Sequence, residues 1–141
     1  SAAIPKSQIQ KWHKQGDINW LGERKDMPAL IAQSEIVCLP TTYGEGVPRI
    51  LIEAAAIGRP IVTTNVSGCR DIVLNEQSGL LVSPKNPSEL ATALESLLLD
   101  KAMRLDFGLK GRELVEKKFC QNIVIEKTLG VYSDLLQKLK C

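Results

Sequence analysis

The sequence predicts an α/β fold: a Rossmann-like, doubly wound parallel sheet that is finished by C-terminal helices. Three observations carry this prediction. Short apolar runs, 36–39, 61–64 and 80–82, are bounded by turn residues, as buried parallel strands are. Segments with helical apolar periodicity lie between these runs, which is typical of a doubly wound sheet. The chain then ends in two long segments, 101–118 and 123–139, whose pattern is helical throughout.

The N-terminal third begins with a predicted helix over residues 5–13. Residues 18–21 are apolar and lead into Gly22, so we expect a short strand there. Asp26 precedes the apolar segment 27–33 and is a residue type that caps helices, which predicts a helix starting at Met27.

The central part contains the run 36–39, predicted as a buried strand with Cys38 as a small core residue. Pro48 suits the first turn of the alanine-rich helix that follows, because proline needs no backbone donor there. That helix is expected to run to about Ile57 and to end at Gly58.

The C-terminal part follows the same alternation. Asn86, Pro87 and Glu89 supply a cap, a proline at the first helical position and a capping-box carboxylate, so a helix starts there. In the last helix an apolar stripe runs through Ile125 and Leu129, and it suits either core packing or contact with another domain. The other predicted elements are the strands 61–64 and 80–82 and the helices 69–74, 101–118 and 123–139.

Composition excludes several classes of function. With 141 residues, 44% of them hydrophobic, the chain suits one folded domain. A net charge of +2 is too small to indicate nucleic-acid binding, and no apolar run approaches the ~20 residues of a membrane span. The four cysteines are scattered, without paired spacing or nearby histidines, so we expect no metal site and a reducing compartment.

The segment 39–56 is the most informative for function. An apolar run ends in a polar, glycine-containing loop, and the loop feeds the start of a helix. Free N–H groups and a positive dipole at a helix N-terminus can receive a phosphate. Glu45 lies in the loop and Glu53 in the helix, seven residues apart, and either carboxylate can accept hydrogen bonds from sugar hydroxyls. This arrangement suits a pocket for a nucleotide-sugar.

These residues resemble the E-x7-E motif of retaining glycosyltransferases with the GT-B fold, the large family 4 group. The resemblance continues in the segments 58–64, 68–73 and 78–82 and covers roughly residues 4–136. The sequences at residues 20–22 and 68–70 are most similar to those of bacterial enzymes that build capsule, exopolysaccharide or O-antigen.

The resemblance implies that residues 1–141 are a single partial domain, the nucleotide-sugar-binding C-terminal domain. The first strand and the N-terminal acceptor domain of such an enzyme are expected to be absent, because no strand and Gly-rich turn precede Pro5. The implied reaction moves a sugar, with retention of configuration, from a nucleotide-sugar, typically a UDP-sugar, to a saccharide or lipid-linked acceptor. No metal or cofactor is implied. The implied location is cytoplasmic, with contact at the inner face of the membrane as an option, and the isolated domain is expected to be inactive.

Individual roles also follow from the resemblance. Glu53 would hold the ribose hydroxyls and Glu45 the donor sugar, while the backbone N–H groups of Gly46, Val47 and Arg49 would stabilise the leaving diphosphate. For each residue a plain structural role is the alternative: a solvated helix or loop carboxylate, a turn glycine, or a solvated arginine.

The predicted site has two further parts. The turn at Gly22 and Arg24 would pass beside the nucleobase, and Thr42 would touch sugar or acceptor. Related enzymes place an Arg/Lys pair for the diphosphate well before the motif, and no such pair is found here.

Two other functions are also compatible with the sequence. One is a UDP-sugar 2-epimerase on the same fold, although His13, the only histidine, is remote from the motif. The other is a non-catalytic module that binds nucleotide-sugars or other proteins.

Overall fold

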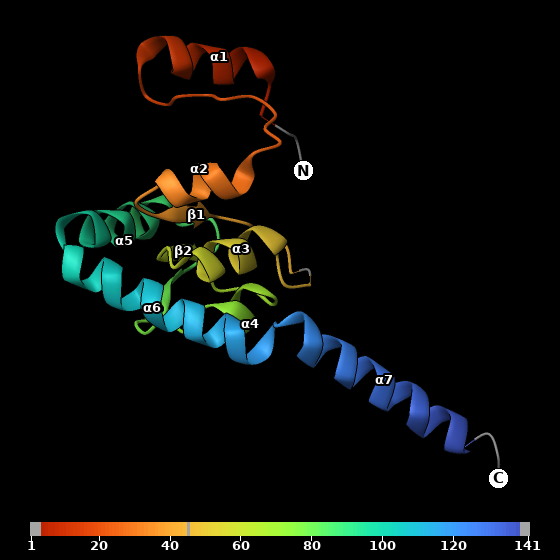
Figure 1. Cartoon of the computed structure of the whole chain (residues 1–141). Helices are drawn as coiled ribbons and strands as arrows, with labels where there is room; N and C mark the ends of the chain where they lie inside the picture. Colours follow the sequence, from red (N-terminus) through yellow and green to blue (C-terminus); the bar gives the residue numbers. More distant parts are fainter. Residues whose placement is uncertain (1–3, 45, 139–141) are drawn as a thin grey trace.

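The structure is a computed structural model that describes residues 4–44 and 46–138, with side chains to residue 133. Helices and strands alternate through the centre of the chain, and helices close it at both ends (Figure 1). The elements are α1 (Lys6–Gln15), α2 (Met27–Gln33), β1 (Val37–Leu39), α3 (Arg49–Ile57), β2 (Ile61–Thr64), α4 (Cys69–Ile72), β3 (Gly79–Val82), α5 (Pro87–Leu99), α6 (Lys101–Lys118) and α7 (Gln121–Lys138).

The sheet has three parallel strands in the order β1-β2-β3. Val37 pairs with Ile61, and Ile61 with Gly79, so the amino ends of all three strands lie at one edge. The central strand β2 is buried along its whole length. Parallel strands need crossover connections, which contain α3 between β1 and β2 and α4 between β2 and β3, and this confirms the predicted doubly wound α/β fold.

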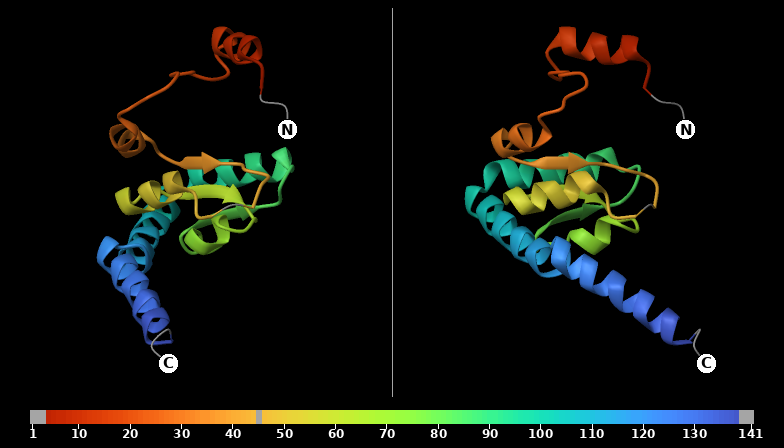
Figure 2. Two further views of the ribbon diagram at one scale, coloured as in Figure 1. Left: turned by 90° about the vertical axis from the view of Figure 1, so that its right-hand side faces the viewer. Right: turned by 45° about the vertical axis from the view of Figure 1, so that its right-hand side comes forward.

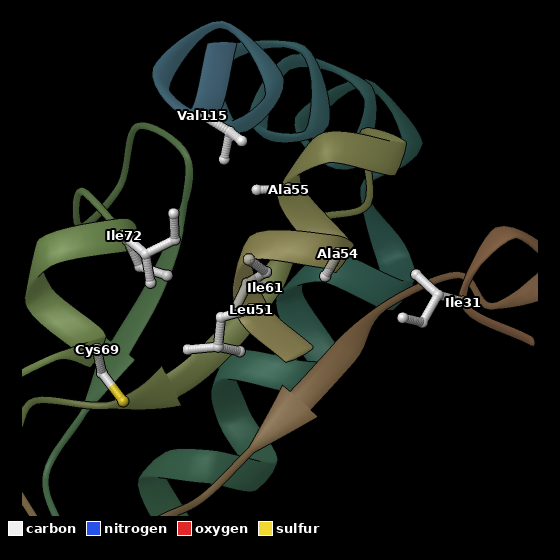
Figure 3. Close-up of a cluster of buried hydrophobic side chains, with 9 residues drawn as sticks. Ile31, Leu51, Ala54, Ala55, Ile61, Cys69, Ile72 and Val115 are labelled. Carbon is white, nitrogen blue, oxygen red and sulfur yellow. The ribbon is translucent and has the colours of Figure 1, made fainter. Parts of the chain in front are cut away.

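Helices cover both faces of this sheet. On one face Ile61 packs with Leu51, Ala54 and Ala55 of α3 and with the buried residues of α4, as the sticks in Figure 3 show. On the other face Val62 joins a second apolar cluster with α5 and the first half of α6. Consecutive residues of a strand point to opposite faces, so one apolar strand serves both clusters.

Helix α6 links the two faces because it packs on α5 with its first half and on α3 and α4 with its second half. Its Gly108 meets Gly58, the residue that ends α3 in the left-handed conformation, φ 79°. A Cβ at Gly108 would lie only 2.1 Å from the Gly58 carbonyl oxygen. The absence of a side chain therefore lets α6 lie directly against the C-terminal end of α3.

Several predicted boundaries are confirmed. Helices 27–33 and 101–118 and strand 61–64 match the sequence prediction, and α5 begins at Pro87 as expected. Asn86 caps α5 by accepting a hydrogen bond from the Glu89 N–H over 3.1 Å.

Three local predictions are wrong. Residues 18–21 form no strand, because no described strand lies beside them, and Trp20 is exposed. Asp26 does not cap α2, because its carboxylate accepts hydrogen bonds from Arg24 instead. Cys38 is exposed rather than part of the core, because β1 is an edge strand.

The two terminal helices lie away from the sheet. Both views in Figure 2 show α1 separated from the body by an extended connection, and α7 projecting from the end of α6. The stripe on α7 is exposed at Ile125, Leu129 and Tyr132, so it does not pack into the core. Among the helices that the structure describes, no segment combines the length and the apolar character needed to cross a bilayer.

Candidate functional site

The candidate site lies at the carboxyl edge of the sheet, where β1 leads into the loop before α3. Two threonines of β2 fix the beginning of this loop. The Thr63 hydroxyl donates to the Leu39 carbonyl over 2.7 Å, and the Thr64 hydroxyl donates to the Thr41 carbonyl. Since both threonines are buried, their hydroxyls need these acceptors, and the pairing holds the loop close to β2.

Helix α3 begins immediately after the loop. Pro48 precedes its first residue in an extended conformation, and the Leu51 N–H donates to the Pro48 carbonyl over 3.0 Å. The N–H groups of Arg49 and Ile50 come before the first intrahelical bond, so they have no carbonyl acceptor within the helix. Together with the helix dipole they make the start of α3 attractive to an anion.

One turn into α3, Glu53 and Arg49 form an ion pair. Arg49 Nε lies 2.7 Å from Glu53 Oε1, in the i,i+4 geometry. The arginine side chain is 91% exposed, whereas the glutamate side chain is 26% exposed and lies between fully buried positions of the same helix. A carboxylate this sheltered needs a partner, and the exposed arginine supplies one that a ligand hydroxyl can replace.

The loop residues next to α3 differ in their exposure. Gly46 is exposed, and a Cβ there would meet no atom within 4 Å, so the backbone is open to an approaching ligand. Val47 is half-buried and packs against the apolar cluster under α3, which anchors the loop to the core. Glu45 lies outside the described residues, so its predicted contact with the donor sugar stays a prediction.

A cavity of about 160 Å³ opens at the same edge, on the α5 side. Thr42 lines this cavity, as do Thr64, Ser83 and Lys85. The last three were not predicted from the sequence, although the ends of β2 and β3 carry them to the same edge as the end of β1. The general rule that ligands of open α/β sheets bind at the carboxyl edge was the signal that could have found them.

Gly22 and Arg24 are not brought into this arrangement. They lie in the connection between α1 and α2, and neither lines the cavity at the carboxyl edge. Arg24 Nε donates to Asp26 over 2.7 Å, and this hydrogen bond lowers the pKa of the Asp26 carboxyl below its ordinary value. The charge of Arg24 is therefore already paired within its own turn.

His13, the only histidine of the sequence, has a structural role. His13 Nδ1 accepts a hydrogen bond from the Trp20 N–H over 3.2 Å and closes the turn after α1. Within residues 4–44 and 46–138, no three side chains of the His, Cys, Asp or Glu type gather as a metal site would require.

The chain is similar to known glycosyltransferases in sequence and in fold. Residues 4–114 match the family described as glycosyl transferases group 1. The capsular polysaccharide biosynthesis glycosyltransferase CapM of Staphylococcus aureus is 35% identical over 97 residues, which cover 69% of this chain and 26% of that protein. The N,N'-diacetylbacillosaminyl-diphospho-undecaprenol alpha-1,3-N-acetylgalactosaminyltransferase of Campylobacter jejuni is 30% identical over 124 residues, covering 88% of this chain and 32% of that protein.

Solved structures share the fold. Sucrose-phosphate synthase of Thermosynechococcus elongatus superimposes with a TM-score of 0.84 at 25% identity, over 94% of this chain and 34% of that one. HepE of Anabaena, solved in complex with UDP, gives a TM-score of 0.83 at 23% identity, over 91% of this chain and 35% of that one. The chain thus spans about a quarter to a third of these relatives.

Proposed function

The chain belongs to the group 1 glycosyl transferases, and from this premise we propose that it is the donor-binding part of a retaining GT-B glycosyltransferase. The proposed donor is a UDP-sugar. The proposed reaction transfers the sugar to a saccharide or lipid-linked acceptor during synthesis of a bacterial surface polysaccharide. CapM, named for capsular polysaccharide biosynthesis, and HepE, solved with UDP and with UDP-glucose, support this choice of product and donor.

One observation carries the proposal: the sheltered carboxylate of Glu53 stands one turn inside a helix whose N-terminus opens at the carboxyl edge of the sheet. A ribose offers two neighbouring hydroxyls, which can donate to the two oxygens of one carboxylate. Hydrogen bonds to a charged acceptor contribute about 1.5–3 kcal/mol each when solvent is excluded. Glu53 is therefore assigned to the ribose.

The diphosphate is assigned to the start of α3. The N–H group of Arg49 has no acceptor within the helix and lies at the positive end of its dipole, and Gly46 and Val47 precede it in the loop that leads into α3. When ribose hydroxyls replace Arg49 at Glu53, the arginine side chain is released, and its 91% exposure leaves it free to reach the phosphates. Charge that develops on the leaving diphosphate is then stabilised by groups already in place.

The other predicted residues keep narrower roles in the proposal. Glu45 binds hydroxyls of the donor sugar, and Thr42 contacts sugar or acceptor from the neighbouring cavity. Gly22 and Arg24 approach the nucleobase only if the segment before α2 moves toward the sheet from its present position. The acceptor is proposed to bind on a further, N-terminal domain of the enzyme, at the cytoplasmic face of the membrane.

Calorimetric titration of the chain with UDP tests this assignment. Glu53→Gln keeps the shape of the side chain and removes its charge, so we expect UDP affinity to fall about ten- to a hundredfold. Glu116→Gln is the matched control, because Arg112 and Glu116 form the same i,i+4 pair on α6, with Arg112 Nε 2.9 Å from Glu116 Oε1. Equal UDP affinity in both variants would contradict the role of Glu53.

A further inference from the structure

We infer that the amino edge of the sheet holds a second binding site, for a phosphate group, opposite the proposed donor site. A cavity of about 180 Å³ lies there, between the residues that precede β1, the end of α3 and the start of α6. Its lining contains three cationic side chains, Arg59, Lys101 and Arg104, and one carboxylate, Glu35. The surplus of positive charge marks the cavity as a place for an anion.

Arg59 supplies the strongest reason for a ligand. Its Nε is buried and has no hydrogen-bond partner, and among the described residues no other buried side-chain nitrogen or oxygen lacks one. The other end of the guanidinium is fixed, because Nη2 donates to the Ala32 carbonyl. Leaving a buried donor of a charged group without an acceptor costs free energy. We therefore expect a hydrogen-bond acceptor at Arg59 Nε.

Arg104 is held in place for the same ligand. Its Nη1 donates to the carbonyls of Leu97 and Leu98 over 2.6 Å and 2.8 Å, at the end of α5. Its Nε lies 3.2 Å from Glu35 Oε2, whose side chain is 70% exposed. The arginine is 16% exposed and makes three contacts, so it presents a fixed positive charge rather than a flexible one.

The start of α6 completes the site. Lys101 is the first residue of this 18-residue helix, and Asp100 caps the N–H of Met103. The N–H groups of Lys101 and Ala102 have no intrahelical acceptor, and the dipole of a long helix adds partial positive charge. Three cations, one carboxylate and this helix end together match a phosphate, which carries more than one negative charge and several acceptor oxygens.

The source of the phosphate is either a free ion or an anionic lipid headgroup. Leu105 lines the cavity and is 66% exposed, and Leu98 and Leu99 nearby are 59% and 80% exposed. Exposed leucines beside cationic side chains also suit a membrane surface. The two sources share the same chemistry at the cavity and are separated by experiment.

Titration of the ¹⁵N-labelled chain with inorganic phosphate, followed by NMR, tests the site. We expect saturable shifts of the Arg59 Nε–Hε signal and of the Lys101 and Ala102 amides. Lys101→Gln should weaken phosphate binding about tenfold, whereas Lys110→Gln, which removes the same charge from the Lys110–Asp106 pair elsewhere on α6, should leave it unchanged. Lys101 is exposed, so its replacement does not disturb the core as replacement of Arg59 could.

A second arm uses sedimentation with phosphatidylcholine vesicles, with and without phosphatidylglycerol. Sedimentation that requires phosphatidylglycerol and Lys101 assigns the site to a lipid headgroup, and phosphate shifts without sedimentation assign it to the free ion. The inference is overturned if neither arm shows binding, or if Lys101→Gln and Lys110→Gln weaken it equally. Neither the phosphate titration nor the vesicle sedimentation depends on UDP binding at the opposite edge of the sheet.

Discussion

The contact between Gly108 and Gly58 gives the most quantitative prediction, because it sets the position of α3 and therefore of Glu53. Replacing Gly108 by alanine places a Cβ 2.1 Å from the Gly58 carbonyl oxygen and 2.9 Å from its carbonyl carbon. Both obstacles are backbone atoms, so no rotamer change relieves the clash. Helix α6 must move away from α3 by about an ångström, which opens the apolar cluster between them.

The magnitude follows from two opposing terms. Overpacking of this kind costs about 1–3 kcal/mol, while alanine gains up to ~1 kcal/mol over glycine inside a helix. With the full gain subtracted, we expect Gly108→Ala to lower the free energy of unfolding by up to about 2 kcal/mol. Gly111 lies one turn further along α6, and a Cβ there would meet Ala55 Cβ and the Ser78 carbonyl oxygen at 3.7 Å, an ordinary contact. Gly111→Ala should stabilise the fold by about 0.5–1 kcal/mol.

Urea denaturation of the two variants and the parent chain, followed by circular dichroism, measures this difference. The two substitutions are chemically identical and lie on the same helix, so intrinsic propensity cancels between them. If Gly108→Ala is as stable as Gly111→Ala, then α6 does not rest on the end of α3 as described.

Four further predictions concern stability and accessibility. Asn86→Ala removes the α5 cap and should cost about 1 kcal/mol in urea denaturation; a cost near zero would refute the cap. The hydrogen bond from the Ser83 N–H holds the pKa of the Glu89 carboxyl below its ordinary value. The stability that ionised Glu89 contributes should therefore be fully present above the pKa of the carboxyl in the unfolded chain, and it should be lost as the pH falls through the pKa in the folded chain. A difference in unfolding free energy between the parent and Glu89→Gln that does not shrink on acidification would contradict this. Thr63→Val removes one of two donors to the Leu39 carbonyl, which also accepts from the Thr41 N–H over 3.0 Å, and should cost about 0.5–1.5 kcal/mol by the same assay, against no cost if the bond is absent. Native alkylation followed by mass spectrometry should modify Cys38 and spare the buried Cys69, and early modification of Cys69 would contradict the packing of α4.

The sequence predicted most elements whose signals are local. The cap of α5 and the end of α3 at Gly58 depend on residues within one or two turns, and both are confirmed. The strand expected at residues 18–21 is wrong because a strand needs a neighbour, which local apolar character does not supply. Cys38 was misplaced for the same reason, since an apolar run does not tell whether its strand is central or at an edge.

For the candidate site, the sequence identified the helix that carries Glu53 but not the partner that holds the carboxylate. The sequence suggested either a phosphate contact or a solvated side chain for Arg49, although its i,i+4 spacing from Glu53 already allowed the ion pair. Lys85 and Ser83 were missed because the strand order and register, and not the sequence, bring the carboxyl ends of β1, β2 and β3 to one edge of the sheet. The cationic cavity at the amino edge likewise joins residues 35, 59, 101 and 104, which no sequence motif connects.

A double-mutant cycle between the protein and the ligand tests the central claim most directly. It compares the affinities of UDP and 2′-deoxy-UDP for the parent chain and for Glu53→Gln. If Glu53 holds the ribose, loss of the hydroxyl should weaken binding to the parent about tenfold or more and should have little effect in the variant. If the two losses are independent, so that the hydroxyl matters equally in both proteins, Glu53 does not bind the ribose and the proposed donor site is wrong.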